Sequence, residues 1–102
     1  MDFEFLDRYL LDGSPSKGEV VRRLLVNAPG SAESAPFFEG MRLLGERTPD
    51  LSLVALRIVL SGRTADDASV IRLRDLSERA RKGGEDAITA RSDYHAAIVT
   101  RE

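Results

Sequence analysis

Few residues in this sequence have the types and spacing that catalysis requires. The single histidine, His95, ends the segment Ser92-Asp93-Tyr94-His95, which holds the three residue types of a hydrolytic triad. On one helix Ser92 and His95 would be neighbours three positions apart, whereas Asp93 would point away. A triad is defined by geometry and not by adjacency. We therefore expect His95 at the margin of an apolar helix face, held by a backbone carbonyl or a carboxylate.

Metal and phosphate chemistry have equally little support. The chain has no cysteine and one histidine, which is too few ligands for a typical zinc site. Asp66-Asp67 is a carboxylate pair, but it lacks the further spaced oxygens of a calcium loop. The eight glycines form no phosphate-binding pattern. We predict a protein that is not an enzyme, with no catalytic residue, metal or cofactor.

Composition indicates an ordinary globular protein. With 102 residues, 42% hydrophobic and 31% charged, residues 1–102 are expected to form a single helical domain. A net charge of −2 gives no general attraction to nucleic acid. Asp2, Glu4 and Asp7 stand where a secretory signal would be basic, and no apolar run approaches a membrane span. A cytoplasmic protein without a membrane partner is predicted.

The segment at residues 51–60 is the most apolar in the chain and organises the predicted fold. On a helix, Leu53, Leu56, Val59 and Leu60 fall on one side, Leu51, Val54 and Ile58 fall on the opposite side, and Arg57 and Ser61 form a narrow polar seam. A helix that is apolar nearly all round is typical of a buried position. We predict an all-α, compact antiparallel bundle of five or six short helices around a central helix at about 50–61.

Helical periodicity and capping residues place the other elements. Helices are predicted at 3–11, at 15–28, from Ser34 onward with Gly40 inside, at 65–82 and at 85–101. Close approach of another helix is the favoured reason for Gly40, with a hinge as the alternative. The second helix begins either with Ser14 as its cap or with Ser16 and Glu19 as a capping box. Thr48 is predicted to cap the central helix. Thr64 is predicted to cap the helix that follows, with Asp67 completing a capping-box pattern.

Each flanking helix has a predicted core face. In the helix at 3–11 the face comprises Phe3, Leu6 and Leu10 with Phe5 and Tyr9. In the helix at 15–28 it comprises Val20, Val21, Leu24, Leu25 and Ala28. In the helix at 65–82 it comprises Ala65, Ser69, Val70, Leu73, Leu76, Ser77 and Ala80. In the last segment the face comprises Ala87, Ala90, Tyr94, Ala97 and Ile98, widened by Ile88, His95 and Val99. Arg91 projects into this last face. Either its stem passes its neighbours toward water, or the helix breaks and restarts at Ser92.

A helix-turn-helix is one functional interpretation. The helices predicted at 50–61 and 64–82 are joined by a turn containing Gly62, and Arg63, Arg72, Arg74, Arg79, Arg81 and Lys82 supply positive charge. The N-terminal end of a recognition helix usually meets the DNA groove. Here that end carries Asp66 and Asp67, whose carboxylates would face phosphates. Nucleic acid is therefore the weaker of the predicted partners.

Protein interaction is the favoured interpretation, and it depends on Ile71. This aliphatic residue lies about 160° from Leu73 around its helix, on the side expected to face water. Three explanations are open. Ile71 is exposed by chance, or the rest of the fold covers it. Alternatively, Ile71 together with Arg72, Arg74 and Arg79 forms a partner surface with Ile71 as its apolar centre. A second candidate surface is the acidic first helix, with Glu4 and Asp7. It could meet the arginine-bearing helix of a neighbouring copy.

We predict a non-enzymatic protein–protein interaction module, an adaptor, inhibitor or accessory subunit of bacterial or phage origin. Its partner would be another protein or a second copy. Short antiparallel helices in about a hundred residues, with opposed charged surfaces, resemble the outline of death-fold adaptor domains in size and helix count alone. That resemblance implies head-to-tail assembly. The alternative is a small helix-turn-helix DNA-binding regulator.

Overall fold

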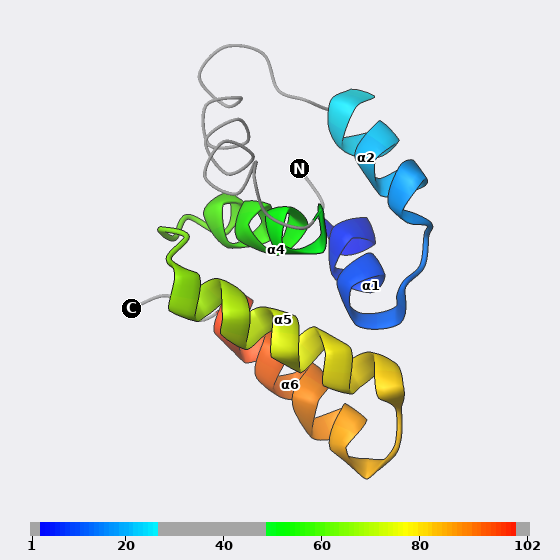
Figure 1. Cartoon of the computed structure of the whole chain (residues 1–102), viewed down its shortest axis with the longest axis vertical. Helices are drawn as coiled ribbons and strands as arrows, with labels where there is room; N and C mark the ends of the chain where they lie inside the picture. Colours follow the sequence, from blue (N-terminus) through cyan, green and yellow to red (C-terminus); the bar gives the residue numbers. More distant parts are fainter. Residues whose placement is uncertain (1–2, 27–48, 100–102) are drawn as a thin grey trace.

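A computed structural model describes residues 3–26 and 49–99 (Figure 1). They form five helices: α1 (Glu4–Asp12), α2 (Lys17–Val26), α4 (Pro49–Leu60), α5 (Asp67–Lys82) and α6 (Glu85–Val99). No strand occurs among them, so the predicted all-α bundle is confirmed. No helix in these two ranges is long and apolar enough to cross a membrane. The helix predicted from Ser34, its Gly40 and the Thr48 cap lie outside the described residues.

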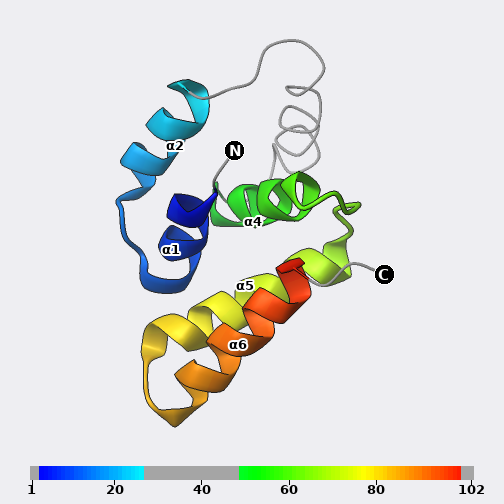
Figure 2. The ribbon, with the colours of Figure 1, turned by 180° about the vertical axis from the view of Figure 1, so that it is seen from behind.

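Helices α5 and α6 form an antiparallel hairpin that runs along one side of the fold. Both views show them side by side (Figures 1 and 2). Gly83 and Gly84, with φ angles of 78° and 86°, make the reversal between them, a conformation that side chains with a Cβ rarely adopt. Helices α1 and α4 both pack on α5, and α2 contacts α1. Therefore α5 joins three neighbours and shares the organising role predicted for the central helix.

Helix α4 is buried nearly all round, as its sequence predicts. Its core residues are Leu53, Val54, Ala55, Leu56 and Ile58, each at most 2% exposed. These side chains point to several sides of the helix, since consecutive helical residues are about 100° apart. Ser52 is buried too. The central-helix prediction is therefore confirmed.

The core face of α5 is also confirmed. Its buried residues are Val70, Leu73, Leu76, Ser77 and Ala80, with Ala65 partly buried against them. The start of the helix differs from the prediction: Asp66, not Thr64, is the N-cap. Its carboxylate accepts hydrogen bonds from the backbone N–H of Ser69 at 2.8 Å and from the Ser69 hydroxyl at 3.1 Å. Asp66 supplies two acceptor oxygens where Thr64 would supply one, which favours the later start.

Helix α6 is continuous, so the predicted alternative of a break at Ser92 is wrong. Ala87, Ala90, Tyr94 and Ile98 are buried. Arg91 reaches out of this face to Asp12 of α1, with 2.6 Å between Nη2 and Oδ1. The predicted widening of the face is wrong for Ile88, which is 77% exposed, and for His95, which is exposed. The buried side of α6 combines the small Ala87 and Ala90 with the larger Tyr94 and Ile98, and α6 packs mainly against α5.

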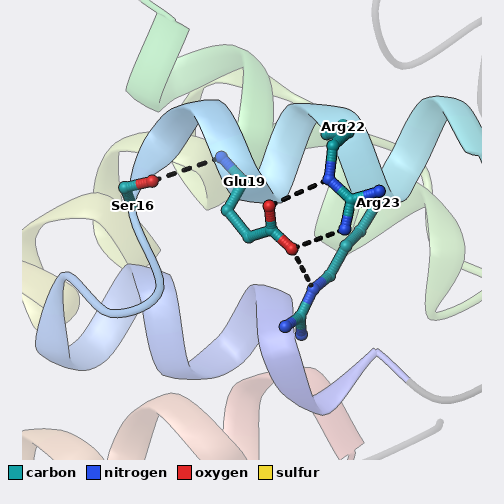
Figure 3. A network of polar contacts seen from close by, with 4 residues as sticks. All are labelled: Ser16, Glu19, Arg22 and Arg23. Atoms are coloured by element: carbon teal, nitrogen blue, oxygen red, sulfur yellow. Dashed lines mark hydrogen bonds and ion pairs between the residues drawn. The ribbon is translucent and has the colours of Figure 1, made fainter.

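Helix α2 begins after Ser16, whose hydroxyl accepts a hydrogen bond from the Glu19 backbone N–H at 3.3 Å (Figure 3). This is one half of the predicted capping box. The Glu19 carboxylate instead binds the side chains of Arg22 and Arg23. These hydrogen bonds lower the pKa of Glu19 to about 2. The support that they give α2 is therefore complete above the ordinary Glu pKa and is lost as the pH falls toward 2.

The predicted core face of α2 is too wide. Val20 and Leu24 are buried, whereas Val21 is 40% exposed. Within the described helices, α2 has α1 as its main neighbour. A single neighbouring helix covers a narrow stripe, so Val21, next to that stripe in the helical projection, stays in contact with water.

Candidate protein-interaction site

The outer face of α5 carries the predicted partner surface. Ile71 is 58% exposed, so the alternative that the fold covers it is wrong. Arg72, Arg74 and Arg79 are exposed on the same helix. We call Ile71 with these three arginines the α5 outer patch. The α5 outer patch therefore combines an apolar side chain, arginines on the same helix and access from solvent, which are features of a partner surface.

Ion pairs along α5 hold two of the rim arginines. Arg74 Nη2 lies 3.1 Å from Glu78 Oε1, and Arg79 Nη2 lies 2.8 Å from Asp75 Oδ2. Both pairs join residues four positions apart, on successive turns of α5. About half of each side chain is exposed, so each pair contributes little to stability. The pairs hold the guanidinium of Arg74, about one turn after Ile71, and that of Arg79, about two turns after it.

The other predicted partner residues, Asp7 and Glu4, separate in the structure. Glu4 is exposed in the first turn of α1. The Asp7 side chain is only 14% exposed, and its two oxygens accept hydrogen bonds from Arg57 of α4: Nε to Oδ1 at 2.6 Å and Nη2 to Oδ2 at 3.0 Å. Both Asp7 oxygens are therefore engaged within the molecule, which makes Asp7 a weaker candidate than Glu4 for contact with a neighbouring copy.

Asp7, Arg57 and Tyr94 form one buried polar cluster that joins three helices. The Tyr94 side chain of α6 is fully buried, and its hydroxyl donates to Asp7 Oδ1 at 3.1 Å. The Arg57 guanidinium also lies over the Phe3 ring, 5.8 Å from its centroid. A bidentate arginine–carboxylate pair is strong and directional. The cluster therefore fixes how α1, α4 and α6 sit relative to one another.

Further contacts attach α1 to the hairpin. Arg81 of α5 donates to the Tyr9 carbonyl at 2.7 Å, with its guanidinium 5.2 Å from the Tyr9 ring centroid. The Tyr9 hydroxyl donates to Asp50 of α4 at 2.9 Å. The acidic first helix meets arginine-bearing helices within one molecule, and its predicted contact with a neighbouring copy stays a prediction. The pairing between acidic α1 residues and arginines therefore stabilises the fold itself. The α5 outer patch is then the better exposed of the two candidate partner surfaces.

Burial raises the pKa of Tyr94 well above its ordinary value of 10.0, and the nearby Asp7 carboxylate adds to this effect. The folded chain therefore keeps a proton that the unfolded chain loses above pH 10. This contribution to stability is complete below pH 10 and is lost as the pH rises toward the folded pKa, at up to about 1.4 kcal/mol per pH unit. We expect urea unfolding at successive alkaline pH values to show this decline.

Tyr94→Phe is the control for this expectation. Burial and Asp50 also raise the pKa of Tyr9, so some alkaline decline should remain in the variant. The wild-type chain should lose more stability than Tyr94→Phe over the same pH range. Parallel pH profiles for the two chains would contradict the assignment to Tyr94.

The sequence-level candidates for chemistry do not come together. Ser92, Asp93 and His95 are exposed, and no hydrogen bond joins them in the part of the chain that the structure describes. The expected carbonyl or carboxylate partner of His95 is absent from the same residues; its ring instead makes an edge contact with Tyr94, 5.8 Å between centroids. Among residues 3–26 and 49–99, no group of three or more potential metal ligands is found.

The connection between α4 and α5 bears on the helix-turn-helix alternative. It spans residues 61–66, with Gly62 at a φ of 84°, whereas a helix-turn-helix usually has a turn of about 3–4 residues. Asp66 and Asp67 are exposed at the start of α5. The end of α5 that would enter a DNA groove is therefore acidic, which disfavours this alternative.

Sequence reasoning missed the buried cluster, although one signal was present. Arg57 is the single charged residue in an otherwise apolar stretch, and a buried guanidinium requires a carboxylate partner. The acidic first helix was one of several possible sources of this carboxylate, since Asp50, Asp66 and Asp67 lie nearer in the sequence. Periodicity identified Arg57 as part of a seam, but it could not identify Asp7 as the group on the other side.

Comparison with known proteins adds no assignment. No protein-family model, curated protein or solved structure matches the chain. The resemblance in size and helix count to death-fold adaptor domains stays a prediction.

Proposed function

We propose that this chain is a non-enzymatic protein–protein interaction module whose partner contacts the α5 outer patch. The supporting observation is Ile71, which is 58% exposed at the centre of a charged helix face. A single exposed aliphatic residue is common. The arrangement around Ile71 is more specific, because arginines flank it and arginine is enriched at the centres of protein interfaces.

The ion pairs of the patch support binding more than stability. Arg74 and Arg79 are held by neighbours on their own helix, so little side-chain freedom would be lost when a partner contacts them. Arg72 has no ion pair in the described part of the chain and is exposed. A partner with one apolar side chain and one or two carboxylates would complement this face.

Replacing Ile71 by arginine tests the patch. We expect Ile71→Arg to change the free energy of unfolding by less than about 0.5 kcal/mol, because the site is exposed. Partner or self association should weaken by about tenfold or more, since an interface anchor contributes at least ~1.4 kcal/mol. Stability is measured by urea unfolding. Association is measured by light scattering and by capture of partners on immobilised chain.

Val21→Arg provides a matched control, because Val21 is also an exposed aliphatic residue but lies on α2. Partners retained by wild type and Val21→Arg but lost with Ile71→Arg would support the proposal. Equal retention by all three chains would contradict it, and unfolding of Ile71→Arg would show that Ile71 belongs to the core.

Absolute mass across a concentration series separates the kinds of partner. A constant monomer mass would mean that the partner is another protein. A defined dimer or open-ended growth would mean that the partner is a second copy, and open-ended growth is the behaviour of a head-to-tail assembly.

The alternative function, a helix-turn-helix regulator, has its own measurement. Binding of arbitrary duplex DNA that weakens steeply with salt and is lost when Arg72, Arg74, Arg79 and Arg81 are neutralised would favour it. No salt-sensitive binding would leave the interaction module as the supported function.

A further inference from the structure

The unpaired charges of the α5–α6 hairpin differ in sign between its two helices. The acidic side chains at the start of α5 and along it already have partners, and they are Asp66, Asp67, Asp75 and Glu78. Two exposed cations of this helix, Arg72 and Lys82, have no ion pair within residues 3–26 and 49–99. The charge that α5 offers to a partner is therefore positive.

Helix α6 offers charge of the opposite sign. Glu85, Asp86 and Asp93 are exposed, and none of the three has an ion pair in the described part of the chain. The arginine of this helix, Arg91, reaches α1 and binds Asp12 there. We use the name α6 outer face for six exposed residues: Glu85, Asp86, Thr89, Ser92, Asp93 and Ala96. The charge of this face is therefore complementary to that of α5.

The charges have the same spacing on the two helices. Arg72 and Arg79 are seven positions apart on α5. Asp86 and Asp93 are seven positions apart on α6. Seven residues make about two helical turns, or roughly 10 Å along the axis, so both arginines can meet both aspartates at once. Arg79 uses Nη2 on Asp75, which leaves the other N–H groups of its guanidinium for a partner.

Helical projection favours one orientation of the two helices. At about 100° per residue, Ile71 lies in the middle of the exposed side of α5, and the two arginines lie along one edge. Ser92 and Ala96 lie near the middle of the exposed side of α6, and the two aspartates lie along one edge. These edges fall on the same side when the helices run antiparallel, whereas parallel helices would place them on opposite sides. In the antiparallel register Ile71 packs over Ser92 and Ala96, whose small side chains allow close approach.

We propose that the α5 outer patch binds the α6 outer face of a second copy of this chain, with α5 of one copy antiparallel to α6 of the other. Arg72 pairs with Asp93 of the neighbouring copy, and Arg79 pairs with Asp86 of the same copy. Ile71 is covered by the small residues of the neighbouring face. This deepens the proposed function by naming its partner, and it rests on that function for the use of the α5 outer patch.

Charge reversal tests the pairing of Arg72 with Asp93. Arg72→Glu and Asp93→Arg each place two like charges opposite one another, so each should weaken self-association about tenfold or more. The double variant Arg72→Glu/Asp93→Arg restores opposite charges across the contact and should recover most of the wild-type affinity. Sedimentation equilibrium of the whole chain over a concentration series measures the association. Added salt should weaken it in the wild type, because exposed charges are screened.

Glu4→Arg is the matched control for Asp93→Arg. It makes the same change in net charge at an exposed acidic residue of α1, and it should associate as the wild type does. Weakening by Glu4→Arg but not by Asp93→Arg would place the neighbouring copy on the first helix and overturn the proposal. Thermal melts of every variant establish that the fold is retained. Little loss of stability is expected from either charge reversal, since both sites are exposed.

Three further results would overturn the proposal: a monomer mass at every concentration, association of Asp93→Arg equal to that of the wild type, or a double variant as weak as the single ones. These failures are distinguishable from failure of the proposed function. Capture of another protein that Ile71→Arg abolishes and Asp93→Arg leaves intact would keep the α5 outer patch and remove the α6 outer face. Self-association that Ile71→Arg leaves intact would contradict both the patch and its contact with α6.

Discussion

Asp7→Asn is expected to lower the free energy of unfolding by about 3 kcal/mol, because it leaves the Arg57 charge without a partner. The Arg57 and Asp7 side chains are only 12% and 14% exposed, so water replaces little of the lost interaction. Asn preserves the shape of the side chain, which confines the change to charge. For a chain of this size the loss corresponds to a fall of roughly 15 °C in Tm. Urea unfolding and calorimetry measure both quantities.

Asp12→Asn is the matched control for this prediction. It is the same substitution on the same helix, and Asp12 is also 2.6 Å from an arginine, Arg91, but these two side chains are about 40% exposed. An exposed pair contributes less than about 1 kcal/mol. Equal losses in Asp7→Asn and Asp12→Asn would contradict the distinction between buried and exposed pairs.

A triple variant separates the cost of an unpaired charge from the value of the cluster itself. In Asp7→Leu/Arg57→Met/Tyr94→Phe, apolar groups replace all three polar partners. Replacing a whole buried polar cluster by apolar groups is often neutral, whereas breaking it is costly. The triple variant is therefore expected to be more stable than Asp7→Asn. A triple variant that is less stable would show that the cluster contributes net free energy beyond satisfying its own members.

Leu56→Asp is expected to unfold the protein. Leu56 is fully buried in α4, and the substitution both removes an aliphatic side chain, at about 2–5 kcal/mol, and buries an unpaired carboxylate at further cost. The sum approaches the total stability of a typical domain, about 5–15 kcal/mol. Circular dichroism should show lost helicity, and the cooperative thermal transition should disappear.

Ile71→Asp introduces the same charge at an exposed position and should melt close to the wild type. A cooperative melt of Leu56→Asp near the wild-type temperature would contradict the central position of α4. Loss of folding in both variants would indicate that the outer face of α5 is more constrained than its exposure suggests.

Local patterns predicted the elements of this fold, because helix periodicity and capping are properties of neighbouring residues. The apolar stretch of α4 and the buried stripe of α5 were both predicted, down to the buried Ser77. Its hydroxyl donates to the Arg74 carbonyl one turn earlier, so it needs no distant partner. The wrong burial predictions concern residues at the edge of a core face. Val21 and Ile88 lie beside the buried stripe of their helices, where burial depends on how far the neighbouring helix extends.

Pairing between distant helices could not be predicted from the same patterns. The Asp7 carboxylate was assigned to a partner surface because it lies on the polar side of α1, yet Arg57 and Tyr94 bind it from 50 and 87 residues away. Periodicity indicates which face of a helix is polar but not what that face meets.

The contacts of α1 have a consequence for how the chain reaches its native state during synthesis. Its arginine and tyrosine partners lie 50, 72, 79 and 87 residues later. The α5–α6 hairpin can form from local contacts as it leaves the ribosome, but α1 waits until α6 has been translated before its last contacts exist. Leu6 and Leu10 stay exposed until the later helices that pack on α1, which are α2, α4 and α5, have also been made. The polar contacts of α1 are completed last, when Arg91 and Tyr94 of α6 become available.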